Sequence, residues 1–215
     1  LEMSNAPLKD EIFYAEIPAR LAALYAQEGH ELEAKAYLDK ADRGLKFLMN
    51  RDSSPNRAWL AEALYRMGRV TPNFLNVDNF GQVLQGERRS QTYLMKTMEQ
   101  NHPIWSAKAS DNLIENDRSY WDFIQKQWSQ PESRNQQSTH LKELHSLVTE
   151  SMYRKPTEPS LWNTHIKKYF DFATELDKKI TDVLFSIEGI TKLTEESLQL
   201  NDVKRPGKDI QKEDL

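Results

Sequence analysis

Histidines and carboxylates are the side chains whose spacing could indicate metal or acid–base chemistry. His30 and Glu31 begin the helical zinc-protease pattern, but the second histidine of that pattern would stand where the chain has Ala34. His140 and His145 are five positions apart, whereas two ligands on one helix face are usually three or four apart. These spacings predict surface histidines and no metal site.

Nucleophilic and cofactor chemistry lack their usual sequence signals. The chain has no cysteine, which excludes thiolate catalysis, disulfides and cysteine metal sites. The phosphate-binding patterns GxxxxGKS/T and GxGxxG and the nucleophile pattern GxSxG do not occur. Carboxylate pairs such as Glu195 and Glu196 lie among polar residues. None has the apolar neighbours that would raise its pKa and suit it to acid–base catalysis. We therefore predict no catalytic residue and no cofactor. An enzyme without a motif is an alternative, with a pocket near His102, Trp105 or His165.

Composition excludes further classes of protein. The 215 residues carry 29 Lys plus Arg against 33 Asp plus Glu, a formal net charge of -4, which argues against a protein built for nucleic acid. No apolar run is long enough for a membrane span, and no charged-then-apolar segment resembles an export signal. We expect a cytoplasmic location, and export by a route without such a signal stays open.

Apolar residues recur at three- and four-residue intervals, which predicts an all-α fold. The first part of the chain predicts a separate turn or angled helix over residues 11–16, a helix from Pro18 to Gly29, a helix from about Glu31 to Asn50, and a helix over 56–67 that ends at Gly68. Residues 77–86 predict a short helix or an irregular turn, because Gly81 and Gly86 weaken helices. Two further helices are expected over residues 85–100 and 111–128.

The loop-like stretch 129–139 is the predicted linker between a helical domain (8–128) and a C-terminal helical hairpin (140–200). This hairpin comprises a helix over 140–153 and a long helix from Ser160 to about Ser186, with a break at Gly189 and a last helix over 191–200. The apolar positions of the long helix form two heptad seams, the first made of Ile166, Ala173, Ile180 and Ile187 and the second of Phe170 and Leu184, with Asp177 out of place in the second. Such seams fit a helical hairpin or a coiled coil that joins copies of this chain through residues 160–187. The charged residues 201–215 predict a disordered tail.

Residues 19–41 resemble one tetratricopeptide (TPR) helix-turn-helix repeat, with Leu21, Ala22, Tyr25, Gly29, Ala34, Leu38 and Ala41 at the signature places. Residues 60–68 resemble the first helix of a second repeat, so the resemblance covers residues 19–68. Gly68 follows Gly29 by 39 residues instead of the usual 34, and the sequence TPNF at 71–74 interrupts the expected second helix. The resemblance implies a concave groove whose partner-binding positions are Ala23, Gln27, Glu62 and Arg66.

The function that these observations favour is a non-enzymatic protein–protein interaction module, an adaptor or chaperone-like domain that binds a partner peptide or helix in this groove. The same helices could instead simply close the core. A different alternative is a bacterial secretion-system component or secreted effector that assembles through its C-terminal long helix. The four groove positions are mixed in charge and contain no cluster of Lys and Arg that would hold a terminal carboxylate.

Overall fold

The computed structural model describes residues 9–51, 56–70, 80–128, 130, 133–154, 156 and 162–203. Within these ranges every regular element is a helix, and the prediction of an all-α fold is confirmed. The elements are α1 (Lys9–Glu11), the π-helix η1 (Ile12–Glu16), α2 (Ile17–Gln27), α3 (Glu31–Met49), α4 (Arg57–Gly68), α5 (Phe80–Glu99), α6 (Trp105–Gln127), α7 (Arg134–Tyr153) and α8 (Thr164–Val203).

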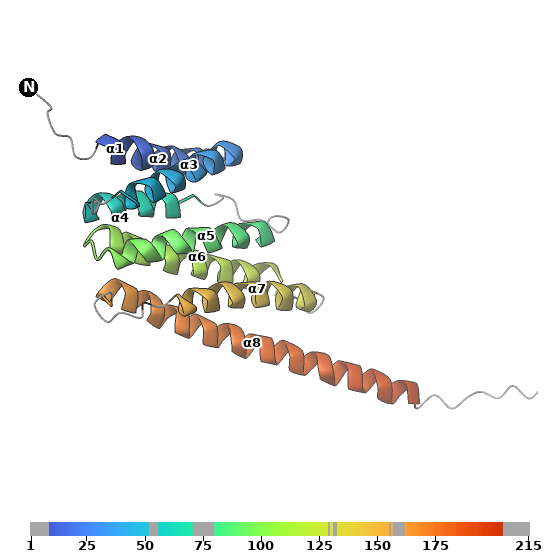
Figure 1. Cartoon of the computed structure of the whole chain (residues 1–215). Coiled ribbons are helices and arrows are strands. Elements are labelled where there is room, and N and C mark those ends of the chain that lie inside the picture. Colours follow the sequence, from blue (N-terminus) through green and yellow to red (C-terminus); the bar gives the residue numbers. More distant parts are fainter. Residues whose placement is uncertain are drawn as a thin grey trace, which may run out of the picture.

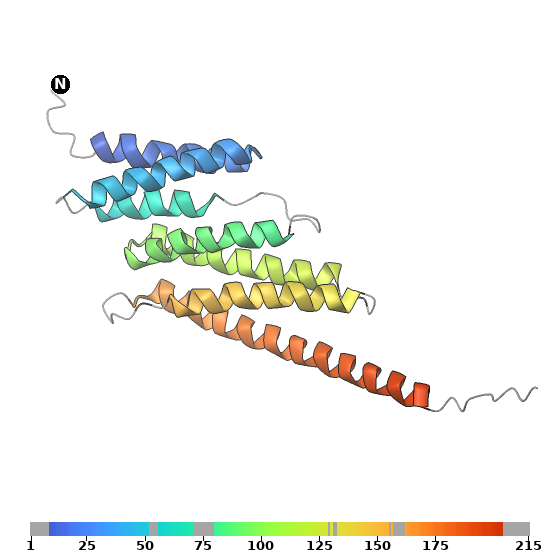
Figure 2. The ribbon, with the colours of Figure 1, turned by 45° about the vertical axis from the view of Figure 1, so that its right-hand side comes forward.

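The helices form a stack in which successive helices run back and forth, from α1 and α2 at one end to α8 at the other (Figures 1 and 2). Helix α2 contacts α4, α4 contacts α6, and α6 contacts α8, while α5 contacts both α4 and α7. Helices α2, α4, α6 and α8 therefore make one layer, and α3, α5 and α7 make the other. We call the first of these the α2–α8 layer.

Residues 9–27 form one continuous helical segment instead of a separate turn before Pro18. The π-helix η1 joins α1 directly to α2, and Glu11, Glu16 and Ile17 all have right-handed helical backbone angles. Pro18 has no backbone N–H to continue the regular hydrogen-bond ladder, and the irregular turn of the π-helix lies just before it. The carbonyl of Tyr14 lies so close to Gly44 of α3 that a side chain at position 44 would overlap it.

Gly29 and Gly68, the two glycines predicted to end helices, stand at helix ends in the structure, for different physical reasons. Gly29 has φ +79°, a left-handed backbone conformation that favours glycine, and it ends the turn after α2. Gly68 is the last residue of α4, where a β-carbon would lie 2.6 Å from the side chain of Leu94. The hydroxyl of Ser90 also donates to the Gly68 carbonyl, so this glycine lets α4 and α5 approach closely.

Two predicted interruptions are absent. Helix α5 runs through Gly81 and Gly86 without a break, so α4 has a full antiparallel partner and the second helix pair is complete. Helix α8 likewise runs through Gly189. A glycine inside a helix costs only about 1 kcal/mol relative to alanine, which packing elsewhere along a long helix can offset.

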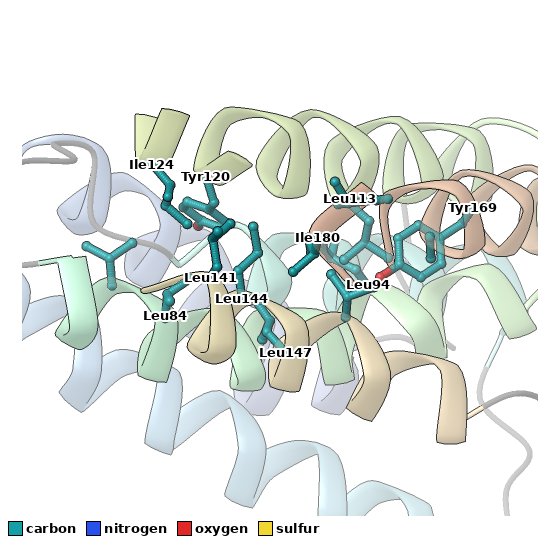
Figure 3. Close-up of a cluster of buried hydrophobic side chains, with 14 of the residues drawn as sticks. Leu84, Leu94, Leu113, Tyr120, Ile124, Leu141, Leu144, Leu147, Tyr169 and Ile180 are labelled. Carbon is teal, nitrogen blue, oxygen red and sulfur yellow. The ribbon is translucent and has the colours of Figure 1, made fainter. Parts of the chain in front are cut away.

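The predicted linker at 129–139 does not divide the molecule. Helix α7 begins at Arg134, so residues 134–139 are helical, and the buried side chain of Gln137 belongs to its first turns. Leucines of α5, α6 and α7 and Tyr169 of α8 meet in one hydrophobic cluster (Figure 3). A second hydrophobic cluster joins α2, α3 and α4. The two clusters meet at α5, where Leu94 belongs to the first cluster and Tyr93 to the second.

The first apolar seam of the long helix lies inside this core instead of facing another copy of the chain. Ile166, Ala173 and Ile180 have no exposed surface, and Ile187 is 7% exposed. Helix α8 packs these residues against α6 and α7. Asp177, which stands between Phe170 and Leu184 in the second seam, has an oxygen 3.1 Å from Nε2 of His145 on α7. The tail predicted for residues 201–215 begins too early, because residues 201–203 still belong to α8; from residue 204 onward it lies outside the described residues.

Candidate functional site

A pocket of about 190 Å³ opens on the α2–α8 layer where α2, α4 and α6 meet. We call it the α2/α4/α6 pocket. Two aromatic residues, three basic residues and two residues of α2 line it, namely Tyr65, Trp105, Arg66, Arg69, Lys108, Ala23 and Gln27. These residues come from three helices that are separated in the sequence, and the helix stack brings them together.

The structure brings the predicted groove residues together. Ala23, Gln27 and Arg66 line the pocket, and Glu62 stands beside it, with Oε1 3.3 Å from a guanidinium nitrogen of Arg66. Ala23 is also largely buried, with a relative exposure of 5%, so this residue packs within the helix stack as well. The predicted groove and the predicted core contact therefore share a residue.

A chain of alternating charges runs from α2 to α4 beside the pocket. Arg20 lies 2.7 Å from Glu16 and 3.0 Å from Glu62, and Glu62 in turn accepts from Arg66. The two carboxylates and two guanidinium groups balance each other. Arg66 therefore brings little net charge into the pocket of its own.

Arg69 and Lys108 supply positive charge that this chain does not balance. Among the described residues, neither has a carboxylate within ion-pair distance. Arg69 has only a 3.5 Å contact from its guanidinium to the hydroxyl of Tyr65, and both basic side chains are exposed. The pocket thus has a local excess of about two positive charges on a protein whose formal net charge is -4.

Two cationic side chains of the pocket lie over the indole ring of Trp105. The guanidinium of Arg66 lies 5.7 Å from the centre of its ring, and Nζ of Lys108 lies 4.8 Å from it. The ring of Tyr65 is 5.3 Å away. Backbone amides of Ile104 and Trp105 donate to Nδ1 of His102, which fixes the position of Trp105 at the start of α6.

The sequence did not reveal this basic cluster. Arg66 lies in the last turn of α4 and Arg69 directly follows that helix, whereas Trp105 and Lys108 lie in the first turn of α6. The spacing of three within each pair is the one signal that the sequence offered, because side chains three positions apart share a helix face. That the two faces meet depends on the contact between α4 and α6.

A second hollow of about 260 Å³ lies on the same layer between α6 and α8. Its lining has both signs of charge, from Arg118, Asp122, Glu175 and Lys179, around Trp121, Phe172 and Leu176. The guanidinium of Arg118 lies 5.5 Å from the centre of the Phe172 ring. This hollow has no excess of one charge, which makes it a useful reference for the α2/α4/α6 pocket.

Two carboxyl groups are completely buried where α5, α6, α7 and α8 meet, a feature that the sequence analysis missed. Glu87 accepts from the amide of Asn116 at 2.9 Å and from the hydroxyl of Tyr120 at 2.8 Å. Asp117 accepts from the hydroxyl of Tyr169 at 3.1 Å. Its other oxygen has no hydrogen-bond partner among the described residues.

Burial raises the pKa values of both carboxyl groups toward and above neutral pH, so the native state holds protons on them well above pH 5. Loss of hydration raises the pKa of Glu87 to about 7, against the opposing effect of its hydrogen bonds from Asn116 and Tyr120. Burial raises the pKa of Asp117 to about 8, and the nearby charge of Glu87 adds to the shift. Burial also raises the pKa values of Tyr120 and Tyr169 well above their ordinary value. This network is enclosed in the core, so it bears on stability.

The histidines have structural neighbours. The ring of His140 lies 4.2 Å from the ring centre of Trp128, and its Nδ1 lies 3.0 Å from Glu143. His145 faces Asp177, and Ser110 donates to the backbone carbonyl of His165. Within the described ranges, no three His, Asp or Glu side chains gather in a way that could hold a metal ion.

Among the described helices, none combines the length and the apolar character needed to cross a lipid bilayer. Comparison of the chain with protein-family models, with curated proteins and with solved structures found no match.

Proposed function

We propose that this protein is a non-enzymatic interaction module, an adaptor or chaperone-like domain that binds a segment of a partner protein across α2, α4 and α6. The observation that carries this proposal is the α2/α4/α6 pocket, in which the aromatic rings of Tyr65 and Trp105 lie next to Arg69 and Lys108, two cations without a balancing carboxylate in the described part of the chain. Aromatic residues and arginine are the residue types enriched where proteins bind one another.

The arrangement of the helices supports a TPR-like organisation of the first part of the chain. Antiparallel pairs α2/α3 and α4/α5 follow each other, and the first helices of the pairs contact each other in one layer. Proteins built from stacked helix pairs bind partners on such a shared surface, because each pair contributes a few side chains to it. The pocket lies on this layer and includes Ala23, Gln27 and Arg66.

The excess charge of the pocket favours an acidic partner segment. Opposite charges steer two proteins toward each other and disfavour wrong partners. Trp105 and Tyr65 offer flat surface for the apolar parts of the same segment. The pocket is too small for a whole helix, so it would receive one or two side chains of a segment that continues over the layer.

The test is affinity capture from a lysate of the native host with the full chain. A variant with Arg69→Glu and Lys108→Glu removes the excess charge of the pocket, whereas Arg118→Glu and Lys179→Glu make the same charge change at the second hollow. Reversal of Glu62 and Arg66 would be less informative, because these two side chains already pair with each other.

We expect one stoichiometric partner that the wild type and the Arg118/Lys179 variant retain and the Arg69/Lys108 variant loses. Far-ultraviolet circular dichroism should show equal helix content for all three proteins, since all four substituted positions lie at the protein surface or on a pocket rim. Equal capture by the Arg69/Lys108 variant and the wild type would contradict the proposed site.

A further inference from the structure

We propose that the α2/α4/α6 pocket recognises a phosphoryl group carried by a side chain of the partner segment. This inference rests on the proposed function, because it names the chemical group that the partner brings to that site. Charge, the identity of the donors and the size of the pocket each support it.

The charge of the pocket matches a dianion better than a single carboxylate. The four groups Glu16, Arg20, Glu62 and Arg66 balance one another, which leaves Arg69 and Lys108 as two positive charges without an ion pair in the described part of the chain. A phosphoryl ester carries about -1.5 to -2 charges at pH 7, and a carboxylate carries one. A carboxylate would leave one of the two cations unbalanced.

The donors suit a tetrahedral oxyanion. Two of the three basic residues are arginines, whose planar groups donate two parallel hydrogen bonds to phosphate or carboxylate oxygens. Lys108, whose Nζ lies 4.8 Å from the centre of the Trp105 ring, adds a compact third donor. The guanidinium of Arg66 lines the same pocket and also donates to Glu62 at 3.3 Å.

The geometry lets these side chains meet one small group. Arg66 and Lys108 both lie over the Trp105 ring, and Arg69 is held only by a 3.5 Å contact with Tyr65. The volume of about 190 Å³ accommodates a phosphoryl group and the carbon that bears it. A side-chain phosphate fits this description, while the rest of the segment would pass over Trp105 and the exposed end of α2.

The experiment is an NMR titration of the full-length, ¹⁵N-labelled protein with three probes. The first is a short phosphoserine peptide, the second is the same peptide with glutamate in place of phosphoserine, and the third is inorganic phosphate. The indole N–H signal of Trp105, assigned by its loss in Trp105→Phe, reports binding at the pocket. The matched variants are Arg69→Gln with Lys108→Gln at the pocket and Arg118→Gln with Lys179→Gln at the second hollow.

We expect the phosphoserine peptide to shift the Trp105 signal and to bind about tenfold or more tightly than the glutamate peptide and inorganic phosphate. The Arg69/Lys108 variant should lose at least tenfold in affinity, whereas the Arg118/Lys179 variant should bind like the wild type. Binding should weaken below about pH 6, where the phosphoryl group takes up its second proton.

Each remaining result overturns the inference in its own way. Equal or tighter binding of the glutamate peptide would keep the acidic-partner function and refute the preference for phosphate. Equal binding of inorganic phosphate would make this a site for the free ion. Unchanged affinity in the Arg69/Lys108 variant, or no shift of Trp105 with any probe, would refute the site itself.

Discussion

The guanidinium of Arg66, near the end of α4, lies 5.7 Å from the centre of the Trp105 ring at the start of α6. This contact joins two helices of the α2–α8 layer at the place where α2 also contributes Ala23 and Gln27. A cation over an indole is stabilised by about 0.5–1 kcal/mol at an exposed site, so the contact can hold Arg66 in place and still release it to a ligand.

Substitution of Trp105 by alanine should weaken ligand binding more than it weakens the fold. The indole positions both Arg66 and Lys108 and is only partly buried, so its loss removes the platform of the pocket. We expect isothermal titration calorimetry with the phosphoserine peptide to show about a tenfold loss of affinity. The control is Trp121→Ala at the second hollow; a similar loss in that variant, or none in Trp105→Ala, would contradict this role.

The buried pair Glu87 and Asp117 makes stability depend on pH in a direction opposite to that of an ion-paired carboxylate, whose pKa is lowered on folding. In the unfolded chain their pKa values lie near 4.5 and 3.8, and in the native state near 7 and 8. Between about pH 4 and pH 8 the native state therefore binds more protons than the unfolded state, and the free energy of unfolding should fall as the pH rises. Urea denaturation at several pH values measures this slope.

Glu87→Gln should flatten that slope, because the amide has no proton to lose and still offers an oxygen to Asn116. We expect this variant to be about 2 kcal/mol more stable than the wild type at pH 8.5 and close to it at pH 4.5. Glu115→Gln on the exposed side of α6 should leave the slope unchanged. Parallel stability curves for the wild type and Glu87→Gln would show that the carboxyl does not titrate as described.

Gly44→Ala should destabilise the protein, because the added methyl group would overlap the carbonyl of Tyr14 in η1. Overpacking of this kind costs about 1–3 kcal/mol, and the backbone of the π-helix would have to move. The matched control is Gly189→Ala in α8, where no atom lies within 4 Å of the added carbon. The free energy of unfolding of that variant, measured by thermal unfolding, should exceed that of the wild type by about 0.5–1 kcal/mol. Equal effects of the two substitutions would contradict the close approach at Gly44.

Helical periodicity and glycine positions predicted the all-α fold and the turn at Gly29, because these depend on local sequence. The same local reasoning failed at Gly81 and Gly189, which stand inside helices. There the neighbouring turns are held by contacts from other helices, and these outweigh the cost of one glycine. Sequence spacing also found the buried seam of α8, but could not tell whether α6 and α7 or another chain would cover it.

Three of the four groove positions predicted from the sequence line one pocket, whereas its basic cluster could not be predicted. Lys108 and Trp105 reach the site only because α6 packs against α4. The buried Glu87 had a local signal, since it stands four positions after Val83 and seven before Leu94, on the apolar face of α5. Local sequence alone predicts that a charged residue at such a position is exposed. Glu87 is buried because Asn116 and Tyr120 of α6 donate hydrogen bonds to it, and the sequence of α5 does not contain that information.

The most direct test of the interaction surface is site-specific photo-crosslinking of the full chain in its native host. A photoreactive residue at Gln27, on the rim of the pocket, is compared with one at Lys40, on the exposed side of α3 in the other layer. We predict a discrete protein adduct from position 27 that disappears when Arg69→Glu and Lys108→Glu are added, and no such adduct from position 40. Adducts from position 40 alone, or from position 27 regardless of the two charge reversals, would contradict partner binding at this pocket.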